Sequence, residues 1–169
     1  IYQFPESEVL PFERLSVDPI LTSERMGILG ELSDPSRNPL VIVSPFSLAH
    51  KTMSPKVLSK LKQTIRKGDQ VSVEQLTVEW TRMGYNPTPM VDRPGVFSRR
   101  GGVIDIFTPG LNNPVRLELL GDEIESIREF DLNTQRSLML VEHVTIFPAS
   151  EVVPNHYDRK VMGQLSEGI

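Results

Sequence analysis

Apolar side chains recur at every second position between residues 95 and 130, and this alternation constrains the fold more than any other feature of the sequence. Four alternating segments are separated by short connections rich in glycine, proline and asparagine: residues 95–100, 103–107, 115–120 and 124–130. Strands joined by short connections pair in antiparallel fashion. The pattern therefore predicts an antiparallel meander, and a further strand is expected near residues 141–147.

A helix is predicted immediately before these strands, over residues 72–84. Ser72 and Gln75 have the spacing of a capping box, and Gly84 suits the position just after a helix. Spacings of three and four residues place one set of apolar side chains on a single face: Val73, Leu76, Trp80 and Met83. We expect this face to cover one side of the sheet, with Trp80 in the core. The central segment is therefore predicted to be an α+β module.

The first 61 residues differ from this module and are typical of alternating strands and helices. Four features are expected there: a strand at 2–4, an ordered loop at 6–19, a helix capped by Thr22 or Ser23, and a helix from Ser54-Pro55 to Leu61. The apolar run at 40–43 has the composition of a strand buried on both faces of a parallel sheet. The Ser44-Pro45 pair that follows is expected to form a turn.

Composition argues against several classes of function. The chain of 169 residues has no cysteine, which excludes disulfides and thiolate metal sites, and its net charge is −4. Residues 68–150 have more acidic than basic side chains, which argues against general nucleic-acid binding. The sequence has no apolar run of transmembrane length, no phosphate-binding loop and no histidines at metal-ligand spacing. We expect no catalytic site, no metal and no cofactor.

Alternation also predicts which side chains of the sheet point away from the core. Arg116, Glu118 and Leu120 share one face of their strand, and Arg100 lies with Ser98 on the solvent face of another. Such a patch is suited to protein docking, because arginine binds carboxylates through two hydrogen bonds and leucine adds apolar area. From alternation alone, a solvated sheet face with weak surface ion pairs remains the favoured alternative.

Two long motifs resemble a known domain. The segments PGVFSRRGGVIDIF (94–107) and PVRLELLGDEIESIR (114–128) resemble the UvrA-binding domain shared by the excision-repair protein UvrB and the transcription-repair coupling factors, or Mfd proteins. The segments LPFERLSVDP (10–19) and FDLNTQRS (130–137) are similar to the Mfd branch in particular. UvrB carries a tyrosine-rich hairpin that probes damaged DNA, whereas here the stretch between residues 4 and 22 has a single aromatic residue, Phe12. Base stacking needs aromatic faces, so UvrB-like damage verification is not expected.

The resemblance implies a domain organisation and a binding site. Residues 1–44 would belong to a partial, degenerate helicase-like α/β domain, residues 45–135 would form an inserted UvrA-interaction domain of antiparallel sheet and helix, and residues 136–169 would return to the helicase-like domain. The resemblance implies UvrA contacts at Arg100, Arg116 and Glu118, which match the family pattern. Leu120 would be a fourth contact, although the family commonly has phenylalanine there. Ser98 and Arg99 would be secondary contacts.

The function implied by the resemblance is that of a non-catalytic adaptor in the cytoplasm. It would bind UvrA and so recruit nucleotide excision repair to stalled RNA polymerase. RNA polymerase and DNA would be bound by other domains of the parent protein, whose translocase motor would use ATP and magnesium outside residues 1–169. The alternative is a fragment of UvrB, or of another ATP-dependent DNA helicase core with direct DNA contacts. The missing phosphate-binding loop and tyrosine-rich hairpin argue against that alternative.

Overall fold

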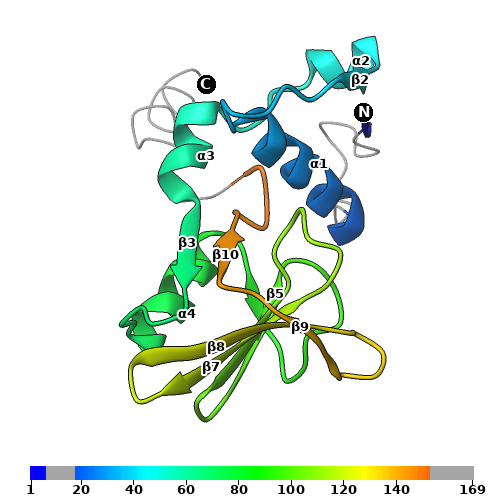
Figure 1. The fold of residues 1–169 in the computed structure, drawn as a ribbon. Coiled ribbons are helices and arrows are strands. Elements are labelled where there is room, and N and C mark those ends of the chain that lie inside the picture. The colour runs from blue at the N-terminus through cyan, green and yellow to red at the C-terminus, as the bar shows by residue number, and fades with distance from the viewer. Residues whose placement is uncertain (7–17, 153–169) are drawn as a thin grey trace, which may run out of the picture.

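The computed structural model describes residues 1–6 and 18–152 of the chain, which form a mixed α/β structure. Figure 1 shows helices α1, α2 and α3 at one end and a six-stranded sheet at the other. The loop expected at 6–19 and the end of the segment 136–169 lie mostly outside the described residues. No helix in the described ranges is long and apolar enough to cross a membrane.

The six-stranded sheet contains the predicted meander. Its strands lie in chain order: β4 (Asn86–Pro87), β5 (Val96–Arg100), β6 (Val103–Ile106), β7 (Val115–Leu120), β8 (Glu123–Phe130) and β9 (Ser137–Leu140). All neighbours pair antiparallel except β4 and β5, which are parallel. The four central strands were predicted almost to the residue. The short edge strands β4 and β9 were not anticipated.

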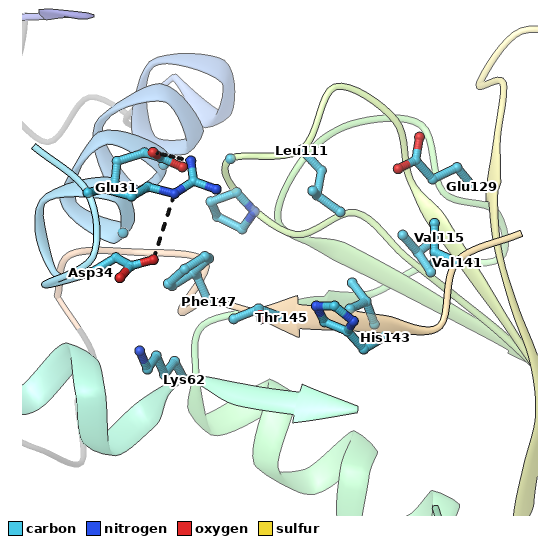
Figure 2. A pocket seen from close by; sticks show the side chains of 16 residues that line it. Glu31, Asp34, Lys62, Leu111, Val115, Glu129, Val141, His143, Thr145 and Phe147 are labelled. Carbon is cyan, nitrogen blue, oxygen red and sulfur yellow. Dashed lines mark hydrogen bonds and ion pairs between the residues drawn. The ribbon is translucent and has the colours of Figure 1, made fainter. Parts of the chain in front are cut away.

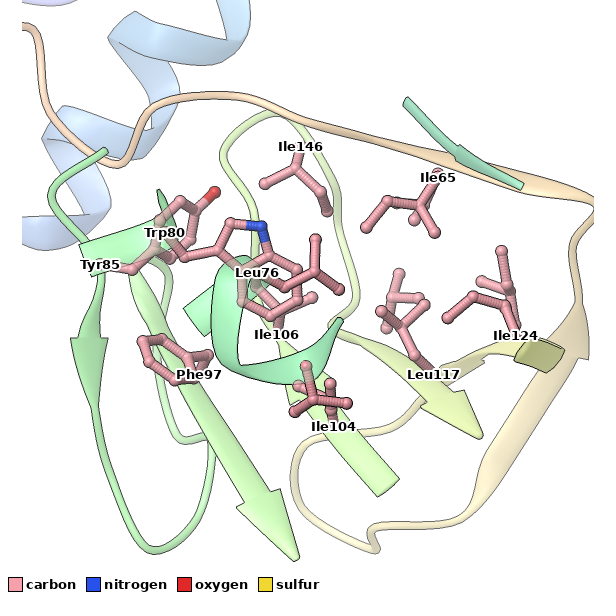
Figure 3. Close-up of a cluster of buried hydrophobic side chains, with 14 of the residues drawn as sticks. Ile65, Leu76, Trp80, Tyr85, Phe97, Ile104, Ile106, Leu117, Ile124 and Ile146 are labelled. Atoms are coloured by element: carbon pink, nitrogen blue, oxygen red, sulfur yellow. The ribbon is translucent and has the colours of Figure 1, made fainter. Parts of the chain in front are cut away.

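Helix α4 (Val73–Arg82) covers one face of this sheet, as predicted. The Ser72 hydroxyl caps the helix by accepting a hydrogen bond from the backbone N–H of Gln75 at 3.3 Å. Figure 3 shows Leu76 and Trp80 of α4 packed with apolar side chains of the sheet. The cluster includes Phe97, Ile104, Ile106, Leu117 and Ile127. Trp80 is fully buried, which confirms its predicted place in the core.

The strand predicted near 141–147 is present as β10 (His143–Ile146), but it does not extend the meander. It pairs antiparallel with β3 (Gln63–Arg66), a strand that was not predicted. Ile65, Val144 and Ile146 belong to the same apolar core as α4 and the large sheet. The domain boundaries expected at residues 44 and 135 remain predictions, but this shared core extends past the second of them.

The N-terminal strands confirm one expectation and overturn another. The two expected strands are present as β1 (Tyr2–Phe4) and β2 (Val41–Val43), and they pair in parallel with each other. The expected burial of the second strand on both faces is wrong, because the side chain of Ile42 is 59% exposed. In the described residues the side chains of β2 are half-buried or exposed, so its sheet lacks the covering layers that bury both faces of a parallel sheet.

The three N-terminal helices begin at proline residues preceded by caps. Helix α1 (Pro19–Leu32) starts earlier than predicted, because Asp18 rather than Thr22 or Ser23 caps it. Ser44-Pro45 does not form a simple turn but begins helix α2 (Pro45–Ala49), with Ser44 as its cap. Helix α3 (Pro55–Leu61) is capped by Ser54, as predicted. The Arg25 guanidinium of α1 donates to the Pro5 carbonyl at 2.7 Å, which ties α1 to β1.

Candidate protein-docking site

The face of the sheet opposite α4 carries charged side chains from neighbouring strands. The strand register places Asp105 opposite Arg116, and Arg116 opposite Arg128. One step along the strands, Glu118 of β7 lies opposite Ser126 of β8. We call five side chains that reach the surface of this face, at least in part, the arginine patch: Arg100, Arg116, Glu118, Leu120 and Arg128. Residues that are distant along the chain thus meet on one surface.

A buried carboxylate lies at the centre of the arginine patch. The carboxylate of Asp105 accepts two hydrogen bonds from Arg116, from Nε to Oδ1 at 2.7 Å and from Nη2 to Oδ2 at 2.9 Å. It also accepts one from Arg100, from Nη2 to Oδ2 at 3.0 Å. The hydrogen bond to Asp105 raises the pKa of Arg116 above its ordinary value. The Arg116 guanidinium therefore stays charged at all physiological pH values.

The two arginines differ in how much of each side chain reaches solvent. The side chain of Arg116 is 18% exposed, and its guanidinium carbon lies 4.6 Å from the centre of the Phe130 ring, in a cation–π contact. The side chain of Arg100 is 56% exposed and uses one of its nitrogens on Asp105. Arg100 therefore has donors available for a partner, whereas Arg116 is held mainly by groups of the sheet.

The remaining members of the patch lie on β7 and β8. Glu118 accepts hydrogen bonds from the Ser126 hydroxyl and from Arg128 Nε, the latter at 3.2 Å. The pairing of β7 with β8 shifts register after Glu118, and Leu120 at the end of β7 is 73% exposed. The expectation of an outward-facing row thus holds for Arg100 and Leu120. Arg116 and Glu118 share that face but are partly covered and paired within the sheet.

The two residues expected as secondary contacts lie outside the arginine patch. Ser98 shares the strand face of Arg100 but is buried, because the segment 88–94 covers it and its hydroxyl donates to the Pro89 carbonyl at 2.9 Å. Arg99 points to the opposite face of the sheet, where its guanidinium pairs with Glu74 of α4 at 3.1 Å. The geometry therefore gives no support to Ser98 or Arg99 as contact residues.

Sequence reasoning missed Asp105 and Arg128. Alternation identifies the strand face of both residues. Asp105 falls among apolar residues of one predicted strand, and Arg128 shares a face with Ser126 in another. A charged residue inside an apolar strand is a signal of a buried ion pair. Its partner was not identified because that depends on strand register.

A separate cavity of about 390 Å³ lies between α1, β10 and the loop at 109–111. Arg37 is one of the lining residues and pairs with Glu31 and Asp34, and Figure 2 shows these two carboxylates on the same side of the cavity. None of the five patch residues lines this cavity. Within residues 1–6 and 18–152, no group of three or more histidine or acidic side chains is arranged to hold a metal ion.

Comparison with known proteins agrees with the motifs. The sequence model of the UvrB interaction domain matches residues 64–152, which is more than half of the chain. The chain is similar to the transcription-repair-coupling factor of Myxococcus xanthus, with 37% identity over 153 residues. It is also similar to the transcription-repair-coupling factors of Staphylococcus aureus strain USA300 (35% identity) and Staphylococcus haemolyticus (36% identity), each over 154 residues.

These alignments cover 90% of this chain but 13% of each relative, so the chain spans a small part of the proteins that it resembles. The matched region contains all six strands of the large sheet, helix α4, strand β10 and all of β3 except Gln63. The arginine patch and the core beneath it therefore lie within the matched segment. The chain belongs to the UvrB interaction domain family and carries the UvrB-homology region of the transcription-repair-coupling factors.

Proposed function

We propose that this chain is the non-catalytic adaptor region of a transcription-repair coupling factor, and that it binds UvrA through the arginine patch. The observation that carries the proposal is the register of β5, β6 and β7, which brings Arg100, Arg116 and Glu118 together on one face. Family membership supports a protein-interaction role for the same segment. Through UvrA, the chain would recruit nucleotide excision repair to stalled RNA polymerase.

The patch has the chemistry of a selective docking surface. Arg100 offers unused guanidinium donors to acidic groups of the partner, and Glu118 offers a carboxylate to a basic group. Leu120 supplies exposed apolar area at the end of β7. Alternating charge selects one partner and one orientation, because a misplaced partner meets like charges.

The remaining parts of the proposal concern the parent protein. The strand–helix–strand unit of β1, α1 and β2 would be part of a degenerate helicase-like domain at residues 1–44 and 136–169, with the UvrA-binding module inserted at 45–135. Parallel pairing of β1 and β2 supports this assignment. The ATP- and magnesium-dependent motor, and the sites for RNA polymerase and DNA, would lie in other domains.

The proposal is tested by measuring binding of UvrA to the chain and to its Arg100→Ala and Arg116→Ala variants by calorimetry. We expect each variant to lose about 2–5 kcal/mol of binding free energy, because removing either guanidinium leaves a carboxylate, of UvrA or of Asp105, without its full set of partners. Arg82→Ala is the matched control: Arg82 is an exposed arginine in the last turn of α4, on the opposite side of the sheet. Wild-type affinity in both patch variants would refute the proposal.

A further inference from the structure

Asp105 lies beneath the arginine patch and, unlike the charged residues of the patch, is only 1% exposed. It lies on β6 between Ser98 of β5 and Arg116 of β7 in the strand register. A buried carboxylate is normally retained only when its oxygens are fully hydrogen-bonded. Here both oxygens are occupied by guanidinium groups, so Asp105 has no accessible atom with which to touch a partner.

One carboxylate thus orients two guanidinium groups. Arg116 donates two hydrogen bonds to Asp105 through two nitrogens, which fixes the plane of its guanidinium. The Phe130 ring contacts the guanidinium from one side. Arg100 shares the Oδ2 atom with Arg116, so its terminal nitrogen is anchored beside the first guanidinium. A free arginine side chain loses rotamer freedom on binding, and an arginine already held in place loses less.

We propose that Asp105 is a positioning residue of the UvrA-docking site, which holds Arg100 and Arg116 in the arrangement that a carboxylate of UvrA requires. The inference rests on the proposed function, because it concerns the same surface. It adds a residue that makes no contact with UvrA, and it assigns different roles to the arginines. Arg116 is the fixed support and Arg100 is the group that reaches the partner.

A different role for Asp105 predicts the opposite change in UvrA affinity when its charge is removed. If Asp105 acted only by neutralising the arginines, its negative charge would weaken attraction of an acidic partner, and removing that charge would tighten binding. If Asp105 acts by positioning, removing one of its oxygens as an acceptor loosens both arginines and weakens binding. Asp105→Asn separates these roles, because asparagine has the same shape but is neutral and presents one acceptor oxygen.

The experiment measures UvrA affinity for Asp105→Asn, with Asp92→Asn as the control. Asp92 is an exposed aspartate that pairs with its neighbour Arg93 in the segment 88–94. We expect Asp105→Asn to weaken binding by about 10- to 100-fold, by analogy with the loss seen when a residue that orients a metal ligand is replaced. The control should bind as the wild type does. Tighter or unchanged binding by folded Asp105→Asn would overturn the inference.

A mutant cycle, in which the two arginine substitutions count as one change, shows whether Asp105 acts on binding through the arginines. If Asp105 acts through Arg100 and Arg116, Asp105→Asn should cause no further loss of affinity in a chain that already carries Arg100→Ala and Arg116→Ala. An additive loss would mean that Asp105 acts independently of the arginines, and would overturn the inference. If Arg100→Ala and Arg116→Ala alone leave UvrA binding intact, the proposed function fails instead.

A measurement on the wild-type chain keeps the inference testable if Asp105→Asn does not fold. The Nε–H of Arg116 donates to a buried carboxylate, so its NMR signal in the free chain should be resolved and slow to exchange with water. Addition of UvrA should change the Arg116 signal little and the Arg100 signals more. Rapid exchange of the Arg116 Nε–H in the free chain would show that the arginines are not held in advance, and would overturn the inference.

Discussion

Trp80 is the largest fully buried side chain among the described residues. Its indole is fully buried, lies edge-on to Phe97 with ring centres 5.7 Å apart, and donates from Nε1 to the Gln63 side chain at 3.2 Å. Trp80→Ala should therefore lower the free energy of unfolding by about 3–5 kcal/mol, through lost burial and a residual cavity. Urea denaturation checks this value, with Val78→Ala on the exposed side of the same helix as a control that changes it little.

Single residues were predictable where their role depends on local periodicity. Trp80 was placed correctly because helical spacing alone put it on the apolar face of α4. Asp105 was not recognised, because its role depends on Arg100 and Arg116, which reach it only through the register of three strands. Ser98 was assigned to the correct strand face, but no local pattern shows that the segment 88–94 folds over it.

At the scale of elements, the start of α4 depends on one hydroxyl. Ser72 accepts the hydrogen bond of the Gln75 N–H, which has no partner within the helix. Ser72→Ala should lower the free energy of unfolding by about 1 kcal/mol, and Ser72→Thr should retain most of the stability because threonine also caps helices. Chemical denaturation of the three chains tests this. Equal losses in the alanine and threonine variants would mean that the cap is not the cause.

The elements that could be predicted are those whose signals are contiguous in the sequence. Alternating apolar residues and glycine-containing turns define β5, β6, β7 and β8, and the structure confirms them. The pairing of β3 with β10 joins segments about 80 residues apart, so neither segment alone identifies its neighbour. Strand β2 has the composition of an enclosed strand, but composition does not show which elements lie beside it.

At the scale of the whole molecule, α1 approaches the loop after β6 at a pair of glycines. A Cβ atom built on Gly27 would lie 2.8 Å from the Cα of Gly110, too close for any side chain without movement of the backbone. Glycine to alanine in a helix interior ordinarily stabilises by about 0.5–1 kcal/mol. Here we expect Gly27→Ala to destabilise the chain instead, because α1 must move away from the loop.

Thermal unfolding shows whether Gly27→Ala lowers or raises the stability of the chain. Glu24→Ala is the control, since Glu24 is an exposed residue of the same helix. A higher melting temperature for Gly27→Ala would show that the helix is not held tightly against Gly110. A lower one would show that the close approach of the two backbones contributes to the attachment of α1.

The pairing of β3 with β10 determines how residues 63–146, the body made of the large sheet and α4, are connected to the rest of the chain. Gln63 and Ile146 are opposite one another in this pair, so the backbone enters and leaves the sheet-and-helix body at neighbouring points, about 5 Å apart. A segment with adjoining ends can be spliced into a surface loop of an unrelated host without stretching or reshaping it. The two connections of this body to the rest of the chain leave from neighbouring backbone positions.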